Sequence, residues 1–175
     1  KELLNEVNRL GIILDVTHLS EPSFWEVMNS YEGPVWASHH NCRSLVDDPR
    51  QLSDEQIKAL IDRGSVIGSA FDAWMLSPNW IRGKSIPLGD EVYIKNVADH
   101  IDHICQIAGN SNHCGIGSDL DGGFGTEQSP CDLNTIADIQ SLNEILAERG
   151  CSYNDVDAIM NRNFISFCAK YLPAG

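Results

Sequence analysis

Histidine and aspartate residues end several short apolar runs of this sequence. His18 ends the run GIILDVTH, and His39 ends the run PVWASH. A third run, HCGIGSDLDG, contains Asp119 and Asp121 at its end. Imidazole and carboxylate groups bind divalent metals such as zinc, and both also transfer protons. One such histidine is most simply a core residue bonded to a carbonyl, but three runs that end in this way together indicate a site.

The spacing of apolar residues predicts strands that alternate with helices. Continuous apolar runs bounded by turn residues predict strands over 11–18, 34–39, 65–71 and 113–117. Helical spacing predicts helices over 1–10, 20–30, 53–63, 91–108, 133–149, 153–160 and 163–171. Strands that alternate with helices form a parallel sheet through right-handed crossovers. The expected fold class is therefore α/β.

The carboxyl ends of parallel strands meet at one edge of the sheet, where α/β proteins bind ligands. Neighbouring strands are about 4.8 Å apart, so His18 and His39 could both reach one metal ion. Two histidines alone do not hold zinc well, and a carboxylate ligand must come from elsewhere. Asp119 and Asp121 have the same parity along the strand. Their spacing therefore leaves open which is a ligand and which is an acid or base.

Length limits the architecture. The chain has 175 residues, which is enough for one domain over 1–175, and four strands are predicted. A complete (β/α)8 barrel takes about 250 residues. We therefore interpret the chain as half of a TIM-type barrel.

Charge argues against two classes of partner. Twelve Lys and Arg residues against 25 Asp and Glu residues give a net charge of −13. No basic stripe is available to neutralise phosphates, so nucleic acid and anionic membrane surfaces are not expected partners. The six cysteines form no CxxC pair, which argues against a zinc knuckle and favours reduced thiols and a cytoplasmic over an exported location. No run of eighteen apolar residues is present.

Several motifs together resemble the membrane dipeptidase (renal dipeptidase) family of zinc metallopeptidases. They are GIILDVTHLS, PVWASHHNCR, DPRQLSDEQI, DHIDHI, GIGSDLDGG and NRNFISF, and they span nearly the whole chain. The resemblance implies a (β/α)8 barrel that holds two zinc ions bridged by a glutamate. The motifs of this chain match the second half of that barrel, its last four β/α units.

The resemblance also implies roles for four residues. His18 and His39 match two histidines on one zinc ion. Asp119 matches a catalytic aspartate beside the metals, and Arg50 matches an arginine that receives the terminal carboxylate of the substrate. A planar guanidinium binds a carboxylate through two parallel hydrogen bonds, which suits this role.

Simpler interpretations of the neighbouring residues stay open. Arg50 could pair with Asp47 or Asp48, and Asp121 could shape the glycine-rich turn. His40 is expected to face away from the site, as a supporting or structural residue. The segment AFDAWML at 70–76 differs from the sequence that many members of the family have there, which bears on substrate preference.

Other residues that the resemblance requires are absent from the sequence. The second metal needs a His-x-Asp pair on the first strand and a bridging glutamate on a middle strand, and neither is present. We therefore expect a fragment that is inactive alone and whose partner is the N-terminal half of the barrel. A homodimer of the complete protein is a further expected association.

The resulting hypothesis is a metallodipeptidase. In the complete site, a zinc-bound hydroxide attacks the peptide carbonyl, Asp119 passes a proton to the leaving amine, and Arg50 limits cleavage to short peptides. One alternative is a metal hydrolase of the same fold that acts on another amide or a lactone. Another is a half-barrel without catalytic activity that binds a partner subunit. The long loop over 72–90, rich in aromatic residues, is predicted to be a lid or a packing element.

Overall fold

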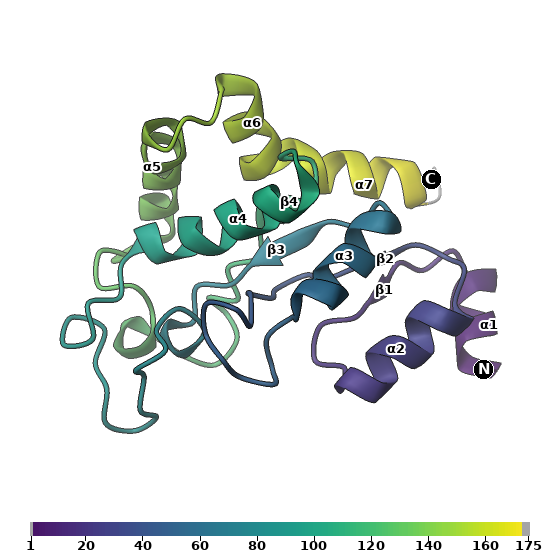
Figure 1. The fold of residues 1–175 in the computed structure, drawn as a ribbon, viewed down its shortest axis with the longest axis horizontal. Helices are drawn as coiled ribbons and strands as arrows, with labels where there is room; N and C mark the ends of the chain where they lie inside the picture. Colours follow the sequence, from purple (N-terminus) through teal and green to yellow (C-terminus); the bar gives the residue numbers. More distant parts are fainter. Residues whose placement is uncertain (1, 173–175) are drawn as a thin grey trace.

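The computed structural model describes residues 2–172, and its strands and helices alternate as predicted (Figure 1). The strands are β1 Leu14–Asp15, β2 Val35–Trp36, β3 Ile67–Ser69 and β4 Cys114–Ile116. The α-helices are α1 Glu2–Arg9, α2 Glu21–Ser30, α3 Asp54–Asp62, α4 Ile94–Ala108, α5 Leu142–Glu148, α6 Tyr153–Asp157 and α7 Asn163–Tyr171. The α/β class is therefore confirmed.

The strands pair in parallel. Leu14 of β1 lies opposite Val35 of β2, and Ile67 of β3 lies opposite Cys114 of β4. A parallel bridge between Ala37 and Ile67 joins the two pairs, so the strands lie side by side in chain order. Their carboxyl ends therefore point to the same edge.

The strands are shorter than the apolar runs that predict them. The first one pairs only at Leu14 and Asp15, and Ile12 is 47% exposed, so the start of the predicted strand lies outside the sheet. Side-chain alternation along a continuous strand would put His18 on the same face as Leu14 and Val16, but the structure does not. His18 has a left-handed backbone with a φ of 68°, and the chain turns out of the sheet before it.

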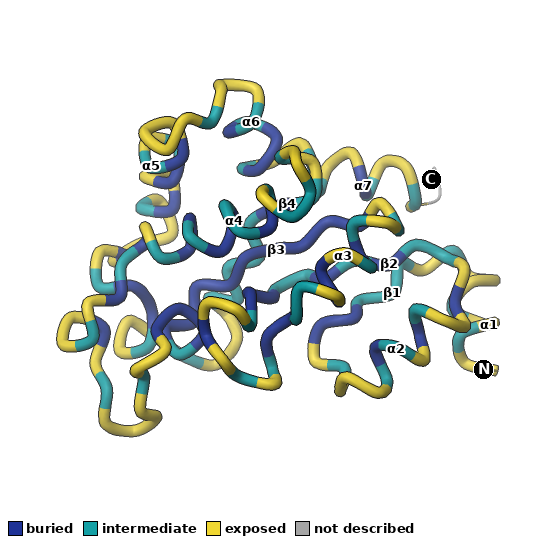
Figure 2. Tube along the Cα trace, viewed as in Figure 1, coloured by how far each residue is buried: buried dark blue, intermediate teal, exposed yellow. Residues whose placement is uncertain are grey.

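One face of the sheet packs against α3 and α4. Ala37, Ile67 and Cys114 lie side by side on this face, and all three are fully buried. The thiol of Cys114 donates to the carbonyl of Ile101 in α4. Figure 2 shows β3 as a continuous buried stretch in the middle of the molecule. Burial of this apolar face supplies most of the driving force for the fold.

Aromatic residues of α7 pack on the opposite face. The ring centroid of Trp36 in β2 lies 5.4 Å from that of Phe164 and 5.8 Å from that of Phe167. Gly115 of β4 makes room for this helix, because a Cβ there would run into the ring of Phe164. The sheet is thus covered on both faces, as parallel sheets usually are.

The ends of two helices show how local sequence fixes their limits. Ser53 and Gln56 form a capping box at the start of α3. Ser20 is the N-cap residue of α2, but its hydroxyl bonds Ser23 Oγ at 3.0 Å and caps no backbone N–H. The N-terminus of α2 is therefore capped less well than the sequence suggests.

The helix predicted over 133–149 is not a single α-helix. It starts as a 3₁₀ turn at Ile136–Ser141 and becomes α-helical only in α5. The carboxylate of Asp138 accepts a hydrogen bond from the backbone N–H of Thr135, which favours the tighter turn. Helix α4 also begins later than predicted, at Ile94, and α6 joins α7 through a π-helical turn.

We predict that Gly117→Ala destabilises the protein by about 3 kcal/mol, as overpacking of a filled space does. A Cβ at Gly117 would collide with the backbone carbonyl of Ser38, which cannot move without displacing His39. Chemical denaturation measures the change. Gly125→Ala is the control, because its Cβ meets only the flexible end of Glu127. Equal stability of the two variants would contradict the close packing of these strands.

Candidate active site

Four side chains that the sequence analysis singled out meet at the carboxyl edge of the sheet. His18 follows β1, His39 follows β2, Asp119 follows β4, and Arg50 lies in the loop between β2 and α3. The Nε2 atoms of His18 and His39 are 3.0 Å apart. Asp119 Oδ2 is 3.8 Å from His39 Nε2, and Arg50 Nη2 is 3.3 Å from His18 Nε2. Three strand ends and one loop therefore converge on one small volume.

The carboxylate of Asp15 ties the ends of β1 and β2 together. Its Oδ1 accepts hydrogen bonds from the backbone N–H of Thr17 at 3.0 Å and of Ser38 at 3.1 Å. Burial alone would raise the pKa of Asp15, but hydrogen bonds from Ser38 and Thr17 outweigh it and lower the pKa. Asp15 is therefore ionised at neutral pH and holds the backbone just before each histidine.

Two of the site residues have unusual backbone conformations. His18 has a φ of 68° and Asp119 has a φ of 57°, a left-handed region that residues other than glycine rarely adopt. The turn at Asp119 is closed by the N–H of Gly122, which donates to the Asp119 carbonyl at 2.8 Å. Such strain costs on the order of 1–3 kcal/mol per residue and clusters at functional sites.

Both imidazoles present Nε2 to the shared volume. His39 Nδ1 is 2.8 Å from Ser38 Oγ, so the rest of the ring is oriented by a second hydrogen bond, as in many metal-binding histidines. Burial, and then the positive charge of Arg50, lower the pKa of His18. A neutral His18 ring has a lone pair available for a metal ion.

Arg50 carries a positive charge that nearby aspartates, Asp119 first among them, stabilise from a distance without forming an ion pair with it. Within residues 2–172, no acidic side chain lies within 4 Å of its guanidinium nitrogens. Asp48, a candidate partner from the sequence, accepts from the backbone N–H of Arg50 at 2.8 Å and not from its side chain. Burial lowers the pKa of Arg50, but the group stays charged. A half-buried, unpaired guanidinium is suited to bind an anionic ligand.

His40 lies beneath Arg50. Its ring is 3% exposed, and its Nε2 is 2.6 Å from Arg50 Nη1 and 2.7 Å from the Arg50 carbonyl oxygen. Burial, together with the charge of Arg50, lowers the pKa of His40 to about 3. The ring is therefore neutral at physiological pH.

The donor set fits two ligands of a metal ion and does not complete its coordination. In the part of the chain that the structure describes, no three His, Cys, Asp or Glu side chains are grouped closely enough to hold a metal. His18 and His39 alone offer two converging nitrogens, and a catalytic zinc ion takes three protein ligands.

Comparison with known proteins identifies the family. The sequence pattern of the membrane dipeptidase family (peptidase family M19) matches residues 1–170. The chain belongs to this family. The match confirms the resemblance that the sequence motifs indicate.

Relatives of this chain are longer than the chain itself. It is 30% identical over 164 residues to an uncharacterized protein in the pqqA 5′ region of Klebsiella pneumoniae, covering 94% of the chain and 56% of the relative. It is 27% identical over 168 residues to dipeptidase tcpJ of Claviceps purpurea, covering 94% of the chain and 36% of that protein. The chain thus spans about half or less of the length of these relatives.

Solved structures share the fold. One is a metallopeptidase from Rhodobacter sphaeroides that was crystallised with a phosphinate mimic of the dipeptide L-Ala-D-Ala. It is similar to this chain with a TM-score of 0.83 at 24% identity, covering 97% of the chain and 45% of that protein. The arrangement of strands and helices is therefore that of a known metallopeptidase over about half of its length.

One residue of the site has no role in the interpretation of the sequence. It is Asp15, although a carboxylate inside an apolar run is a signal that a buried group needs it. Asp121 lies inside the turn that the bond from the Gly122 N–H to the Asp119 carbonyl closes, in line with the simpler interpretation of this residue. Asp121 is exposed, and among the described residues no hydrogen bond of its side chain is seen. No helix of the described residues is long and apolar enough to cross a membrane.

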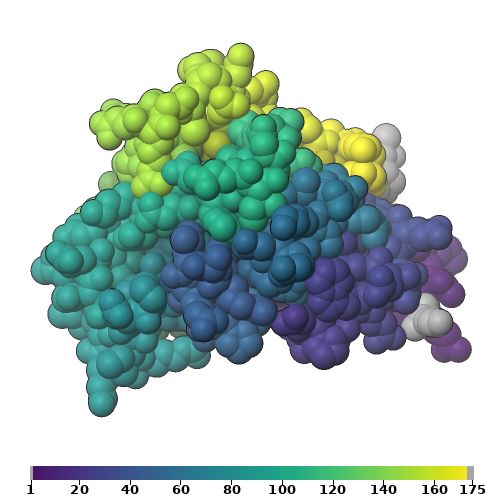
Figure 3. Space-filling model, in the orientation of Figure 1, coloured from purple at the N-terminus to yellow at the C-terminus, as the bar shows by residue number. Residues whose placement is uncertain are grey.

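The loop over 72–90 projects from the body of the molecule (Figure 3). At its base, Asp72 accepts from the indole Nε1 of Trp74 at 2.6 Å and from Gln128 Nε2 at 2.9 Å. Burial raises the pKa of Asp72. Its carboxylate therefore joins this loop to the glycine-rich loop that follows Asp119, and Arg82 lies over the Trp74 ring.

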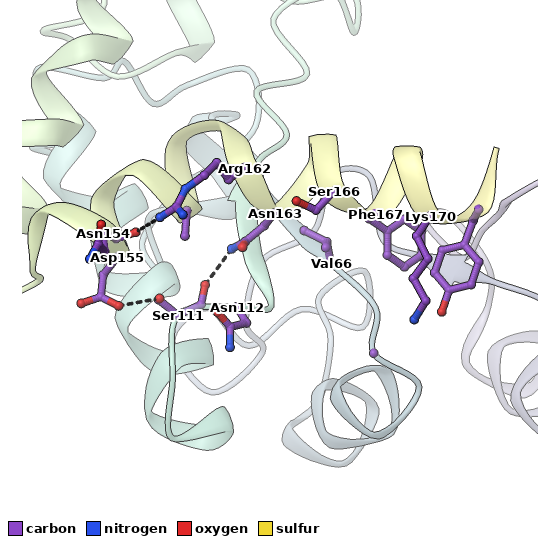
Figure 4. Close-up of a pocket in the computed structure, with 13 residues that line it drawn as sticks. Val66, Ser111, Asn112, Asn154, Asp155, Arg162, Asn163, Ser166, Phe167 and Lys170 are labelled. Atoms are coloured by element: carbon purple, nitrogen blue, oxygen red, sulfur yellow. Dashed lines mark hydrogen bonds between the residues drawn. The ribbon is translucent and has the colours of Figure 1, made fainter. Parts of the chain in front are cut away.

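A cavity of about 470 Å³ lies at the other end of the strands, between α6, α7 and the amino ends of β3 and β4 (Figure 4). Asn163 at its wall donates to the carbonyls of Ser111 and Cys114, both at 2.7 Å. Asp155 accepts from the hydroxyl of Ser111. These polar groups satisfy one another and attach α6 and α7 to the sheet, far from the histidines.

We predict that Asp15→Ala destabilises the protein by about 1–3 kcal/mol, because two part-buried backbone N–H groups lose their acceptor. The lowered pKa means that this contribution is complete above the unfolded-state pKa of about 4 and is lost as pH falls through the folded value. Urea denaturation at pH 7 and at successively lower pH measures both effects. Asp121→Ala, an exposed aspartate, is the control. If both variants unfold like the wild type, Asp15 does not hold the strand ends.

Proposed function

We propose that this chain supplies part of the active site of a zinc-dependent dipeptidase. The proposal rests on the convergence of four side chains, which form a chain of contacts. Arg50 is 3.3 Å from His18, His18 is 3.0 Å from His39, and His39 is 3.8 Å from Asp119. Two imidazoles, one carboxylate and one guanidinium without a direct carboxylate partner are groups that the metal-assisted hydrolysis of a short peptide with a free carboxylate can use.

His18 and His39 are the residues that would hold one metal ion. We propose that its remaining ligands, and those of the second metal, come from residues outside this chain. Two facts support this part of the proposal: the two histidines do not complete a coordination shell, and relatives are about twice as long. On this proposal the 175-residue chain is half of a (β/α)8 barrel and is inactive alone.

The bound metal supplies Lewis-acid polarisation of the scissile carbonyl and lowers the pKa of water. Residues of this chain bind the substrate and transfer the proton. Arg50 binds the terminal carboxylate of the substrate, because its guanidinium is half-buried and has no competing carboxylate partner. Asp119, beside His39, would accept a proton from the attacking water and deliver it to the leaving amine. Its carboxylate is held near His39 by the left-handed turn that Gly122 closes.

The preferred substrate distinguishes a dipeptidase from the alternative, a metal hydrolase of the same fold that acts on another amide or a lactone. A dipeptidase cleaves free dipeptides faster than N-acylated amino acids, which keep the amide next to the carboxylate but lack the free amino group. It also cleaves them faster than lactones, which lack the free carboxylate that Arg50 would bind. The opposite preference would favour hydrolysis of another amide or a lactone on the same site. Absence of bound metal in the full-length protein would favour a half-barrel that only binds a partner.

We predict that Asp119→Asn in the full-length protein lowers kcat on dipeptides by about 10²–10⁴-fold, the usual contribution of a positioned general acid or base. Zinc content, measured by elemental analysis, stays at the wild-type level because the two imidazoles are unchanged. Asp121→Asn, two residues away and exposed, is the matched control and retains activity. Unchanged turnover in Asp119→Asn would remove Asp119 from the mechanism, and joint loss of zinc would make it a ligand.

A further inference from the structure

His40 stands next to a site residue in the chain, but its side chain points elsewhere. Its backbone N–H donates to the carbonyl of Gly68 at 2.7 Å, which joins it to β3. This bond turns the ring beneath the loop that carries Arg50. In the described residues, the Nδ1 atom of His40 is buried and has no hydrogen-bond partner. The polar contacts of the ring in the described residues are therefore all made by Nε2.

Both contacts of His40 Nε2 are made to Arg50. The guanidinium Nη1 lies at 2.6 Å, and the backbone carbonyl oxygen of the same residue lies at 2.7 Å. A ring nitrogen with a proton donates to the carbonyl, and a bare ring nitrogen accepts from the guanidinium. Only one of these contacts is a hydrogen bond at a time. The tautomer with its proton on Nδ1 accepts from the guanidinium through Nε2, and it is the tautomer that holds the Arg50 side chain.

Few other contacts fix the Arg50 guanidinium. Its Nη2 is 3.3 Å from His18 Nε2, and no carboxylate of residues 2–172 is within ion-pair distance. A long side chain with few partners loses much rotamer freedom when it binds a ligand. A contact that fixes it beforehand lowers that loss.

We propose that His40 is the positioning residue that holds Arg50 with its Nη2 edge turned toward His18, ready for the substrate carboxylate. This inference rests on the proposed function of Arg50. It adds a specificity role, because His40 acts only on substrates that present a carboxylate to Arg50. His40 itself touches neither substrate nor metal.

A purely structural role is the competing explanation, and the chain offers a matched residue for it. His100 in α4 is 1% exposed, and its Nδ1 accepts from the backbone N–H of Cys42 at 3.0 Å. Burial lowers its pKa to about 4, so it too is neutral. His100 has no contact with Arg50 among its hydrogen bonds. Loss of either ring should affect stability, but only loss of His40 should affect carboxylate recognition.

The experiment compares His40→Leu, His40→Gln and His100→Leu in the full-length, metal-loaded protein. Each is assayed on a dipeptide and on the same dipeptide with its terminal carboxylate amidated. Leucine removes both contacts with Arg50, so we expect KM for the dipeptide to rise about 10- to 100-fold, the range of a hydrogen bond to a charged group, with little change in kcat. The kcat/KM for the amide should change less than threefold. Glutamine offers both a donor and an acceptor and should restore most of the loss.

Three outcomes overturn the inference. Equal losses on dipeptide and amide in His40→Leu, or a KM change in His100→Leu of the same size, would make His40 merely structural. Failure of glutamine to restore dipeptide binding would also contradict the proposed contacts.

Failure of the proposed function gives a different result. In that case Arg50→Ala would prefer the dipeptide over its amide as strongly as the wild type does. Alternatively, the wild type would cleave neither substrate. A crystal structure of His40→Leu still decides the positioning claim in that case. A guanidinium displaced from His18 supports it, and one that stays within hydrogen-bond distance of His18 refutes it.

Discussion

The site depends on the two hydrogen bonds that Asp15 accepts from the backbone of Thr17 and Ser38. They fix the point at which β1 and β2 stop pairing, and both histidines follow within three residues. Because the sheet is parallel, the two chains leave it in the same direction. The Nε2 atoms therefore meet at 3.0 Å, a separation that the two short strands alone would not set.

At the same edge of the sheet, several polar groups lack partners among the described residues. Two imidazole nitrogens converge without a third ligand in the described residues, and the guanidinium of Arg50 has no carboxylate there. The left-handed backbone at His18 and Asp119 adds strain. A ligand of the right chemistry would partner the imidazoles and the guanidinium, whereas the backbone strain belongs to the fold itself. In the cavity beside α7, by contrast, the side chains of Asn163 and Asp155 already have hydrogen-bond partners in the chain.

The sequence predicted the order of strands and helices, because apolar runs and the capping signals at Ser53 are local. It also predicted which residues meet, since strand ends of a parallel sheet share an edge. It did not predict the strand limits or the direction of His18, because these depend on Asp15, which bonds a strand 23 residues away. The sequence also did not predict the contact of His40 with Arg50. Spacing indicated only that His40 faces away from His39, and not what lies beneath it.

Anomalous diffraction at the zinc absorption edge, from crystals of the full-length protein grown with zinc, tests the central claim most directly. We predict a peak within bonding distance of the Nε2 atoms of both His18 and His39, about 2.0–2.1 Å from each, which requires the rings to separate slightly. Ligands from outside residues 1–175 should complete the shell. A zinc peak elsewhere, or crystals with zinc and no peak between these two nitrogens, would contradict the assignment of this edge as a metal-dependent active site.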